Sequence, residues 1–249
     1  MNKVYCGDNA EVLATFPDAC IDLVVTSPPY DDLRTYGGHS WDFPAVAREL
    51  TRVLKQGGVI VWVVGDATVK GSETLTSMKQ AIHFKDVCGL RVHDTMIYEK
   101  NSPTFPAKAE GSRYTQIWEY VFVISKGKPV CSRLICDKKN RWAGHKDWSG
   151  KLKKPVPEYS PRTNIWKYVT SMGDAGGHPA PFPESLVRDH IISWSNPGDV
   201  VLDPFAGSGT TLKVAKEYRR QYVGIEINPE YVNICERRIN SAIVEKDGV

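Results

Sequence analysis

The chain has 249 residues, of which 41% are hydrophobic and 24% charged, and its formal net charge is +3. This size and composition predict one large α/β domain with a full hydrophobic core and an insertion. A membrane protein is excluded because no segment approaches the ~18 consecutive apolar residues of a membrane span, and the start of the chain resembles a strand rather than a signal sequence. The six cysteines form no Cys-x-x-Cys pair, so neither a disulfide framework nor a metal site is predicted.

Strand and helix patterns alternate along the chain. Seven strands are predicted at Lys3–Cys6, Leu23–Thr26, Val59–Val64, His93–Glu99, Glu119–Ser125, Val200–Asp203 and Tyr222–Glu226. Helices are predicted at Phe43–Leu54, Thr74–Cys88, Pro183–Ser193, Leu212–Glu217 and Pro229–Glu245. The first of these is expected to stop at Gly57 and Gly58. This alternation predicts a doubly wound, largely parallel sheet, and the two strands between residues 93 and 125, which lack a helix between them, predict an antiparallel edge.

The segment Thr26–Tyr30 reads Thr-Ser-Pro-Pro-Tyr and follows the apolar run Ile21–Val25, so it is expected at the end of a buried strand. Its two prolines have a fixed φ and no N–H, so the carbonyls of Ser27 and Pro28 can accept hydrogen bonds from the amino group of a ligand. Tyr30 adds a flat ring that can stack on a planar heterocycle. The alternative is a proline turn that simply ends the strand.

Residues 126–167 are strongly basic. This segment holds twelve Lys and Arg residues and three acidic residues, a net charge of +9 that leaves −6 for the rest of the chain. Trp142, Trp148, Tyr159 and Trp166 are interleaved with these charges. A cationic, aromatic and irregular insertion suits contacts with the phosphates and base edges of nucleic acid. The alternative is an ordinary solvated loop region.

A strand, a glycine-rich turn and a helix follow one another near the C-terminus. The turn, Asp203–Thr211, reads Asp-Pro-Phe-Ala-Gly-Ser-Gly-Thr-Thr. Its glycines allow a ligand to approach the backbone, and the helix N-terminus attracts a carboxylate or phosphate. Glu226 ends the next strand, about 20 residues beyond the turn, where a carboxylate typically meets ribose hydroxyls. Leu212 replaces the third glycine of the dinucleotide pattern and no Walker phosphate loop is present, which disfavours NAD, FAD and nucleoside triphosphates.

Together, Thr26–Tyr30 and Asp203–Thr211 resemble the paired motifs of the amino-group DNA methyltransferases, which modify N4 of cytosine or N6 of adenine. The catalytic motif precedes the cofactor motif, as in the β-type permutation of that family. The segments Gly7–Ala10, Trp118–Gly127 and His178–Pro183 also resemble family segments, so the resemblance covers nearly the whole chain.

The resemblance implies an α/β fold with a doubly wound, mostly parallel, seven-stranded Rossmann-like sheet, an antiparallel edge and a circularly permuted motif order. It divides the chain into a catalytic half (1–126), a basic target-recognition insertion (127–177) and a cofactor-binding half of the same domain (178–249). The implied cofactor is S-adenosyl-L-methionine, which leaves as S-adenosyl-L-homocysteine, and no metal is implied.

By the same resemblance, catalysis is assigned to Ser27, Pro28, Pro29 and Tyr30. The exocyclic amine would donate hydrogen bonds to the Ser27 side chain and the Pro28 carbonyl, which favours a pyramidal nitrogen whose lone pair can attack the methyl group. The base must first leave the duplex, and Tyr30 is expected to stack on it.

Cofactor binding is assigned to residues from both ends of the chain. Asp203 is expected to meet the ammonium group, Phe205 the adenine and Glu226 the ribose, with a helix cap, a core position and a surface position as the respective alternatives. Asp8 is expected to contact the adenine amino group or to cap a turn. The full set is Asp8, His178, Pro179, Asp203, Pro204, Phe205, Ala206, Gly207, Ser208, Gly209, Thr210, Thr211 and Glu226.

The expected partner is double-stranded DNA, and the expected location is the cytoplasm, away from membranes, for a bacterial or phage-encoded protein. A cognate restriction nuclease and a second copy of the chain are further candidate partners. The residues predicted to contact DNA are Arg34, Arg133, Lys138, Lys139, Arg141, Lys146, Lys151, Lys153 and Lys154.

Cytosine N4 is favoured over adenine N6 as the methylated atom, because Ser27 replaces the Asp that is often found in adenine enzymes of this family. Methylation of RNA or protein is a weaker alternative, since such enzymes usually carry Asn at this position. An inactive DNA-binding module is weaker still, because both motifs are intact.

Overall fold

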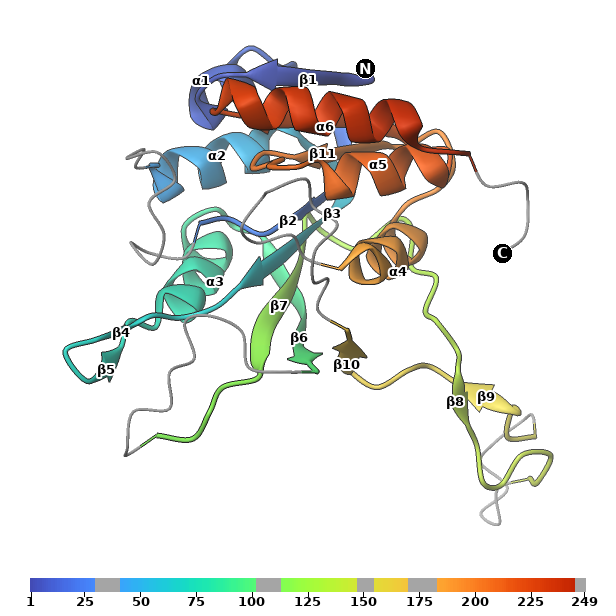
Figure 1. The fold of residues 1–249 in the computed structure, drawn as a ribbon. Coiled ribbons are helices and arrows are strands. Elements are labelled where there is room, and N and C mark those ends of the chain that lie inside the picture. Colours follow the sequence, from blue (N-terminus) through green and yellow to red (C-terminus); the bar gives the residue numbers. More distant parts are fainter. Residues whose placement is uncertain (30–40, 102–112, 147–154, 170–182, 245–249) are drawn as a thin grey trace.

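The computed structural model describes residues 1–29, 41–101, 113–146, 155–169 and 183–244. An eight-stranded sheet organises this part of the chain (Figure 1). In order across the sheet, the strands are β1 (Lys3–Cys6), β12 (Gln221–Glu226), β11 (Val200–Asp203), β2 (Ile21–Thr26), β3 (Leu54–Val64), β7 (Trp118–Ser125), β6 (Arg91–Lys100) and β10 (Ile165–Tyr168).

Within this sheet β7 is antiparallel to its neighbours β3 and β6, and every other pair is parallel. The predicted class, α/β with a mostly parallel sheet, is therefore confirmed, and all seven predicted strands are present. The prediction of seven strands is one short, because β10 adds an eighth at the edge beside β6. The antiparallel strand β7 lies inside the sheet rather than at its edge, because it pairs with β3 on one side and with β6 on the other. Only Trp166 of β10 is buried, so this strand leaves almost no hydrophobic pattern in the sequence.

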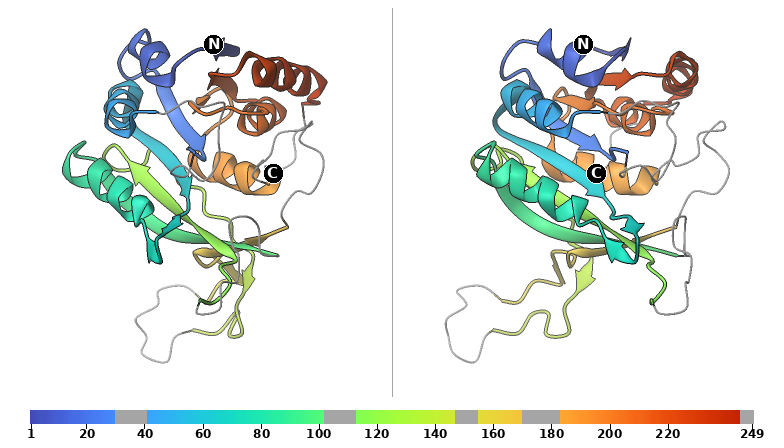
Figure 2. Two further views of the ribbon diagram at one scale, coloured as in Figure 1. Left: turned by 60° about the vertical axis from the view of Figure 1, so that its left-hand side comes forward. Right: turned by 90° about the vertical axis from the view of Figure 1, so that its left-hand side faces the viewer.

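Helices cover both faces of the sheet (Figure 2). Helices α1 (Asn9–Ala14), α2 (Phe43–Val53) and α3 (Thr76–Asp86) pack on one face, and α4 (Glu184–Trp194) and α5 (Thr210–Glu217) pack on the other, while α6 (Pro229–Ser241) lies against α5. In β2, Val24 belongs to the first hydrophobic cluster, and Leu23 and Val25 belong to the second. A strand that is buried on both faces is apolar along its length, as this one is.

The chain leaves the neighbouring strands β2 and β11 toward opposite faces. β2 is followed by α2, on the first face, and β11 is followed by α5, on the second. In a doubly wound sheet, ligands bind outside the carboxyl ends of the strands at such a reversal. The two sequence motifs follow these two strands, so the topology alone brings them to the same place.

Helix α2 starts after Asp42, whose carboxylate accepts a hydrogen bond from the first turn. It ends at Val53, and the predicted role of Gly57 and Gly58 as its stop signal is wrong because both glycines lie within β3. Gly57 has φ +80°, and a Cβ there would collide with the side chain of Val130. Gly57 therefore lets the segment after β7 approach β3 closely.

Part of the basic segment leaves the main body. Strands β8 (Lys138–Lys139) and β9 (Tyr159–Ser160) pair outside the large sheet, in an arm that projects from the molecule in every view (Figures 1 and 2). A smaller hairpin, β4 (Thr68–Val69) and β5 (Ser72–Glu73), follows β3. Among the described helices, none has both the length and the apolar character that a membrane span requires.

Candidate active site

The two motifs are joined by a hydrogen bond. Thr26, the last residue of β2, donates its hydroxyl to Oδ1 of Asp203, the last residue of β11, at 2.6 Å. Both side chains are buried. Ser27, Pro28 and Pro29 follow directly, and Pro28 is buried while its neighbours are half-buried. The predicted catalytic and cofactor segments thus share one edge of the sheet.

Asp203 carries a carboxyl group in an enclosed position, with only 1% of the residue exposed. Burial raises the pKa of this carboxyl to about 6, although hydrogen bonds from Thr26, Thr211 and the Phe205 N–H oppose that change. The Phe205 N–H lies 3.0 Å from Oδ1. Asp203 therefore holds the ends of β2 and β11 together and places a titratable charge beneath the glycine turn.

Glu226, at the end of β12, anchors the glycine turn from the other side. Its Oε2 accepts the Gly207 N–H at 2.8 Å, and its Oε1 accepts the Asn228 N–H at 2.9 Å. Gly207 has φ +50°, and Gly209, which caps α5, has φ +82°. The carboxylates of Asp203 and Glu226 thus flank a turn whose backbone requires glycine at two positions.

Gly209 is also fixed by its contact with α6, because a Cβ there would collide with Cys235. Gly209→Ala should therefore lower the free energy of unfolding by about 3 kcal/mol, of which about 1 is the backbone cost and the rest is overpacking. Gly144→Ala is the matched control: its φ is also +82° and no atom lies within 4 Å of its added Cβ, so only the backbone cost applies. Urea unfolding would measure both. Equal losses would contradict a steric role for Cys235.

Three side chains at this edge were not predicted from the sequence. Arg238 of α6 donates to the carbonyl and hydroxyl oxygens of Ser208 at 2.9 and 2.7 Å, and so braces the glycine turn. Asn9 donates to the Pro204 carbonyl at 3.4 Å. Trp41 packs edge-on against Phe205, with ring centroids 4.8 Å apart. Asn9 lies within Gly7–Ala10, a segment that resembles the family, but Arg238 and Trp41 lie outside every motif, so no local signal identifies them.

Of the other predicted cofactor residues, Asp8 lies at the start of a helix, and two lie outside the part of the chain that the structure describes. Asp8 caps α1, where its Oδ1 accepts the Glu11 N–H at 3.0 Å. This short helix was not predicted. His178 and Pro179 lie outside the described residues, as do the predicted catalytic residue Tyr30 and Arg34.

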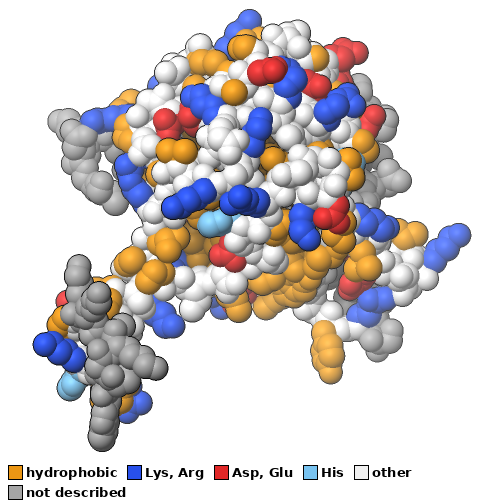
Figure 3. All heavy atoms as spheres, turned by 180° about the vertical axis from the view of Figure 1, so that it is seen from behind, with side chains coloured by type: hydrophobic (Ala, Val, Ile, Leu, Met, Phe, Trp, Pro, Cys, Tyr) orange, Lys and Arg blue, Asp and Glu red, His pale blue; other side chains and the backbone are white. Residues whose placement is uncertain are grey.

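The predicted DNA-contact residues do not form one group. Lys138, Lys139, Arg141 and Lys146 are exposed on the arm, whose basic side chains are visible at lower left in Figure 3. Arg133 instead lies close to the main body, where its guanidinium donates to Oδ1 of Asn196 at 2.6 Å. The remaining three, Lys151, Lys153 and Lys154, lie outside the described residues.

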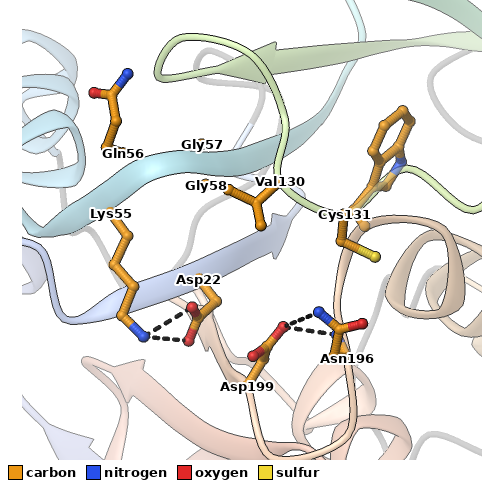
Figure 4. A pocket seen from close by; sticks show the side chains of 10 residues that line it. Asp22, Lys55, Gln56, Gly57, Gly58, Val130, Cys131, Asn196 and Asp199 are labelled. Atoms are coloured by element: carbon orange, nitrogen blue, oxygen red, sulfur yellow. Dashed lines mark hydrogen bonds and ion pairs between the residues drawn. The ribbon is translucent and has the colours of Figure 1, made fainter.

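A pocket of about 250 Å³ lies at the opposite, amino-terminal edge of the sheet (Figure 4). Its charged groups are already paired: Lys55 contacts both carboxylate oxygens of Asp22 at 2.8 Å, and Asp199 accepts the Asn196 N–H at 2.6 Å. The first contact joins the starts of β2 and β3, and the second lies within the loop that precedes β11, so each charged side chain that lines the pocket has a partner. The described residues contain no cluster of three or more His, Cys, Asp or Glu side chains that could hold a metal.

Comparisons with known sequences agree with this geometry. The family model described as DNA methylase matches residues 21–237. The orphan methyltransferase M.BamHII of Bacillus amyloliquefaciens is 50% identical over 246 residues, with 91% of each chain covered. The type II methyltransferase M.SmaI of Serratia marcescens is 28% identical, over 95% of this chain and 90% of its own.

Solved structures lead to the same family. The cytosine-N4-specific PvuII DNA methyltransferase matches with a TM-score of 0.74 at 25% identity, over 95% of this chain and 85% of its own. The Thermus thermophilus protein TTHA0409, solved in complex with S-adenosyl-L-methionine, matches with a TM-score of 0.67 at 29% identity, over 97% of this chain and 95% of its own. The chain therefore belongs to the N6/N4 family of DNA methylases and is a DNA methyltransferase that uses S-adenosyl-L-methionine.

Proposed function

We propose that this DNA methyltransferase acts on the exocyclic N4 of a cytosine flipped out of duplex DNA. The observation that carries the proposal is the hydrogen bond between Thr26 and Asp203, which joins the Ser-Pro-Pro segment to the glycine turn where β2 and β11 diverge. Two findings support cytosine: Ser27 at the motif position, and the similarity to a cytosine-N4-specific enzyme.

The residues around the glycine turn fit the cofactor. When bound, S-adenosyl-L-methionine supplies an electrophilic methyl group on a sulfonium ion. We assign Glu226 to the ribose hydroxyls, Phe205 to the adenine and Asp203 to the ammonium group, because an acidic group, an aromatic ring and a buried negative charge surround one turn. Residues 204 and 206–211 would approach the cofactor through their backbone, and Asp8, His178 and Pro179 would complete the site.

The Ser-Pro-Pro-Tyr segment would prepare the amine for methylation. The lone pair of the exocyclic nitrogen is delocalised into the base, which makes it a weak nucleophile. The Ser27 side chain and the Pro28 carbonyl would each accept a hydrogen bond from the NH2 group and so favour a pyramidal nitrogen. Tyr30 would stack on the extruded base. Pro29 would hold the segment rigid and donate no N–H that competes with the amine.

We further propose that the chain works in three parts, with residues 1–126 and 178–249 as the two halves of the catalytic domain and residues 127–177 as the part that recognises the target. The exposed cations of the arm, Lys138, Lys139, Arg141 and Lys146, support phosphate contacts. The name of the type II relative M.SmaI supports a cognate restriction nuclease as a partner, whereas M.BamHII, at 50% identity, is named an orphan methyltransferase. A homodimer remains a prediction.

Adenine N6 is the second candidate for the methylated atom, because the matching family model covers both reactions. The test is to incubate the protein with labelled S-adenosyl-L-methionine and, in separate reactions, duplex DNA, RNA or a protein extract, and then to digest the DNA to nucleosides and separate them. We expect label in N4-methylcytosine. Label in N6-methyladenine would overturn the choice of base, and label in RNA or protein but not in DNA would overturn the proposed substrate.

A further inference from the structure

The arm consists of two legs, residues 137–146 and 155–162. The legs are held together beyond β8 and β9: the Asn140 N–H donates to the Glu158 carbonyl at 2.8 Å, and Gly144 and Val156 continue the ladder. This arm is therefore an ordered hairpin in its described part. Its position relative to the sheet depends on the contacts at its base.

One guanidinium joins both legs of the arm to the body. Arg162, in the leg that leads into β10, donates from Nε to Oδ2 of Asp137 in the other leg at 2.7 Å. The same guanidinium donates from Nη1 to Oδ2 of Asp189, on α4, at 2.7 Å. Arg162 was counted in the sequence as part of the basic segment, but its side chain is directed into the protein, with 26% exposed.

Asp189 is the fixed point of this junction, with only 5% of its side chain exposed. It also accepts hydrogen bonds from the Tyr168 hydroxyl at 2.7 Å and from Arg188 Nε at 2.9 Å. Burial opposes ionisation of this carboxyl, but its three hydrogen-bond donors keep its pKa below the ordinary value. The carboxylate therefore stays charged and tied to β10 and the arm.

Apolar contacts surround the junction. Trp166 of β10 stacks on the fully buried His190 of α4, with ring centroids 4.8 Å apart, and the Arg162 guanidinium lies 5.0 Å from the Trp166 ring. A buried ion pair adds little net stability compared with apolar packing, but it requires one geometry. The packing of Trp166 on His190 can thus hold β10 against α4, while the ion pairs of Arg162 with Asp137 and Asp189 define the angle at which the arm leaves the main body.

We propose that Arg162 and Asp189 are positioning residues, which hold the arm at the angle that allows it to make sequence-specific contacts with the bound DNA. This inference rests on the proposed function of the basic segment. On this account Arg162 binds carboxylates of the protein rather than a DNA phosphate, and an acidic residue, Asp189, is necessary for DNA recognition.

Two substitutions separate this role from general attraction between charges. Arg162→Lys keeps the positive charge, but an ammonium lacks the planar fork that spans two carboxylates. Asp189→Asn makes the protein more positive, so charge attraction alone would lower KM for DNA. We expect both variants to raise KM for DNA. We also expect both to lower the site ratio, which is methylation at cognate sites divided by methylation at sites with one changed base. Asp189→Asn should change both quantities by about tenfold, and Arg162→Lys should change both by about threefold.

Arg188→Ala is the matched control, because Arg188 also donates to Asp189 but lies on the same helix and joins no part of the arm. The KM for DNA and the site ratio of Arg188→Ala should stay within about twofold of wild type. In all three variants, kcat at saturating DNA and the affinity for S-adenosyl-L-methionine should also stay within about twofold of wild type.

The inference is overturned if Arg162→Lys keeps the wild-type site ratio, or if Arg188→Ala lowers the site ratio as much as Asp189→Asn does. Arg162→Lys decides the matter if Asp189→Asn does not fold. An absence of DNA methylation by the wild type would instead refute the proposed function.

Discussion

Ser27→Ala should lower kcat for DNA methylation about a hundredfold, because it removes one of the two acceptors proposed to hold the exocyclic amine. The loss should fall on the chemical step rather than on cofactor binding, since Ser27 follows β2, whereas the glycine turn follows β11 and Glu226 ends β12. Single-turnover assays with labelled S-adenosyl-L-methionine would measure the rate, and calorimetry would measure the affinity.

Ser241→Ala, at the exposed end of α6, is the control for loss of a serine hydroxyl and should retain wild-type kcat. A Ser27→Ala enzyme with full activity would remove the Ser27 side chain from the mechanism. A large loss of cofactor affinity would instead make Ser27 part of the cofactor site.

Asp203→Asn should weaken S-adenosyl-L-methionine binding by about tenfold without lowering stability at pH 8. The amide oxygen of asparagine can still accept the hydrogen bonds that Thr26 and the Phe205 N–H donate to Oδ1. What is lost is the charge proposed to attract the ammonium group. With a pKa of about 6 against an ordinary 3.8, the enclosed carboxyl costs roughly 3 kcal/mol to ionise, so the variant should be at least as stable as wild type.

The pH dependence follows from the same pKa. Because the folded-state pKa of Asp203 lies above the unfolded value, the folded protein binds more protons between about pH 4 and pH 6. This group therefore adds stability as the pH falls through that window and costs stability above it. Cofactor affinity should change in the opposite sense, falling as the pH drops through about 6, and neither effect should occur in Asp203→Asn.

Calorimetric titrations and thermal unfolding between about pH 5 and pH 8 would measure both effects. Asp22→Asn is the control, since this carboxylate lies near the other end of β2 and pairs with Lys55, so its loss should leave cofactor affinity unchanged. Equal affinity of Asp203→Asn and wild type at pH 8 would show that the Asp203 charge takes no part in cofactor binding.

The sequence was sufficient to predict those parts of the candidate site that consist of consecutive residues. The Ser-Pro-Pro segment, the glycine turn and the apolar strands are local patterns, and the structure brings the two motifs together because their strands, β2 and β11, are neighbours. Contacts between distant residues left no such signal. Arg238 braces the glycine turn from α6, 30 residues further along the chain, and nothing around it in the sequence indicates this contact.

The basic segment shows a second limit of sequence analysis. Counting charges treated all its cations alike, but Arg133 and Arg162 are hydrogen-bonded to Asn196 and Asp189 of the main body, whereas Lys138 and Arg141 are exposed on the arm. Similarly, β10 was missed because its four residues join the sheet through pairing with β6, which depends on tertiary structure rather than on its own composition.

The most direct measurement is to express the protein in a methylation-deficient host and to sequence the host DNA by a method that reports the modified base at each position. The wild type should leave N4-methylcytosine at one recurring short sequence, and Ser27→Ala should leave almost none. N6-methyladenine at a recurring sequence would contradict the proposed base. Unmodified DNA in cells that contain the folded, cofactor-binding protein would contradict its proposed action on duplex DNA.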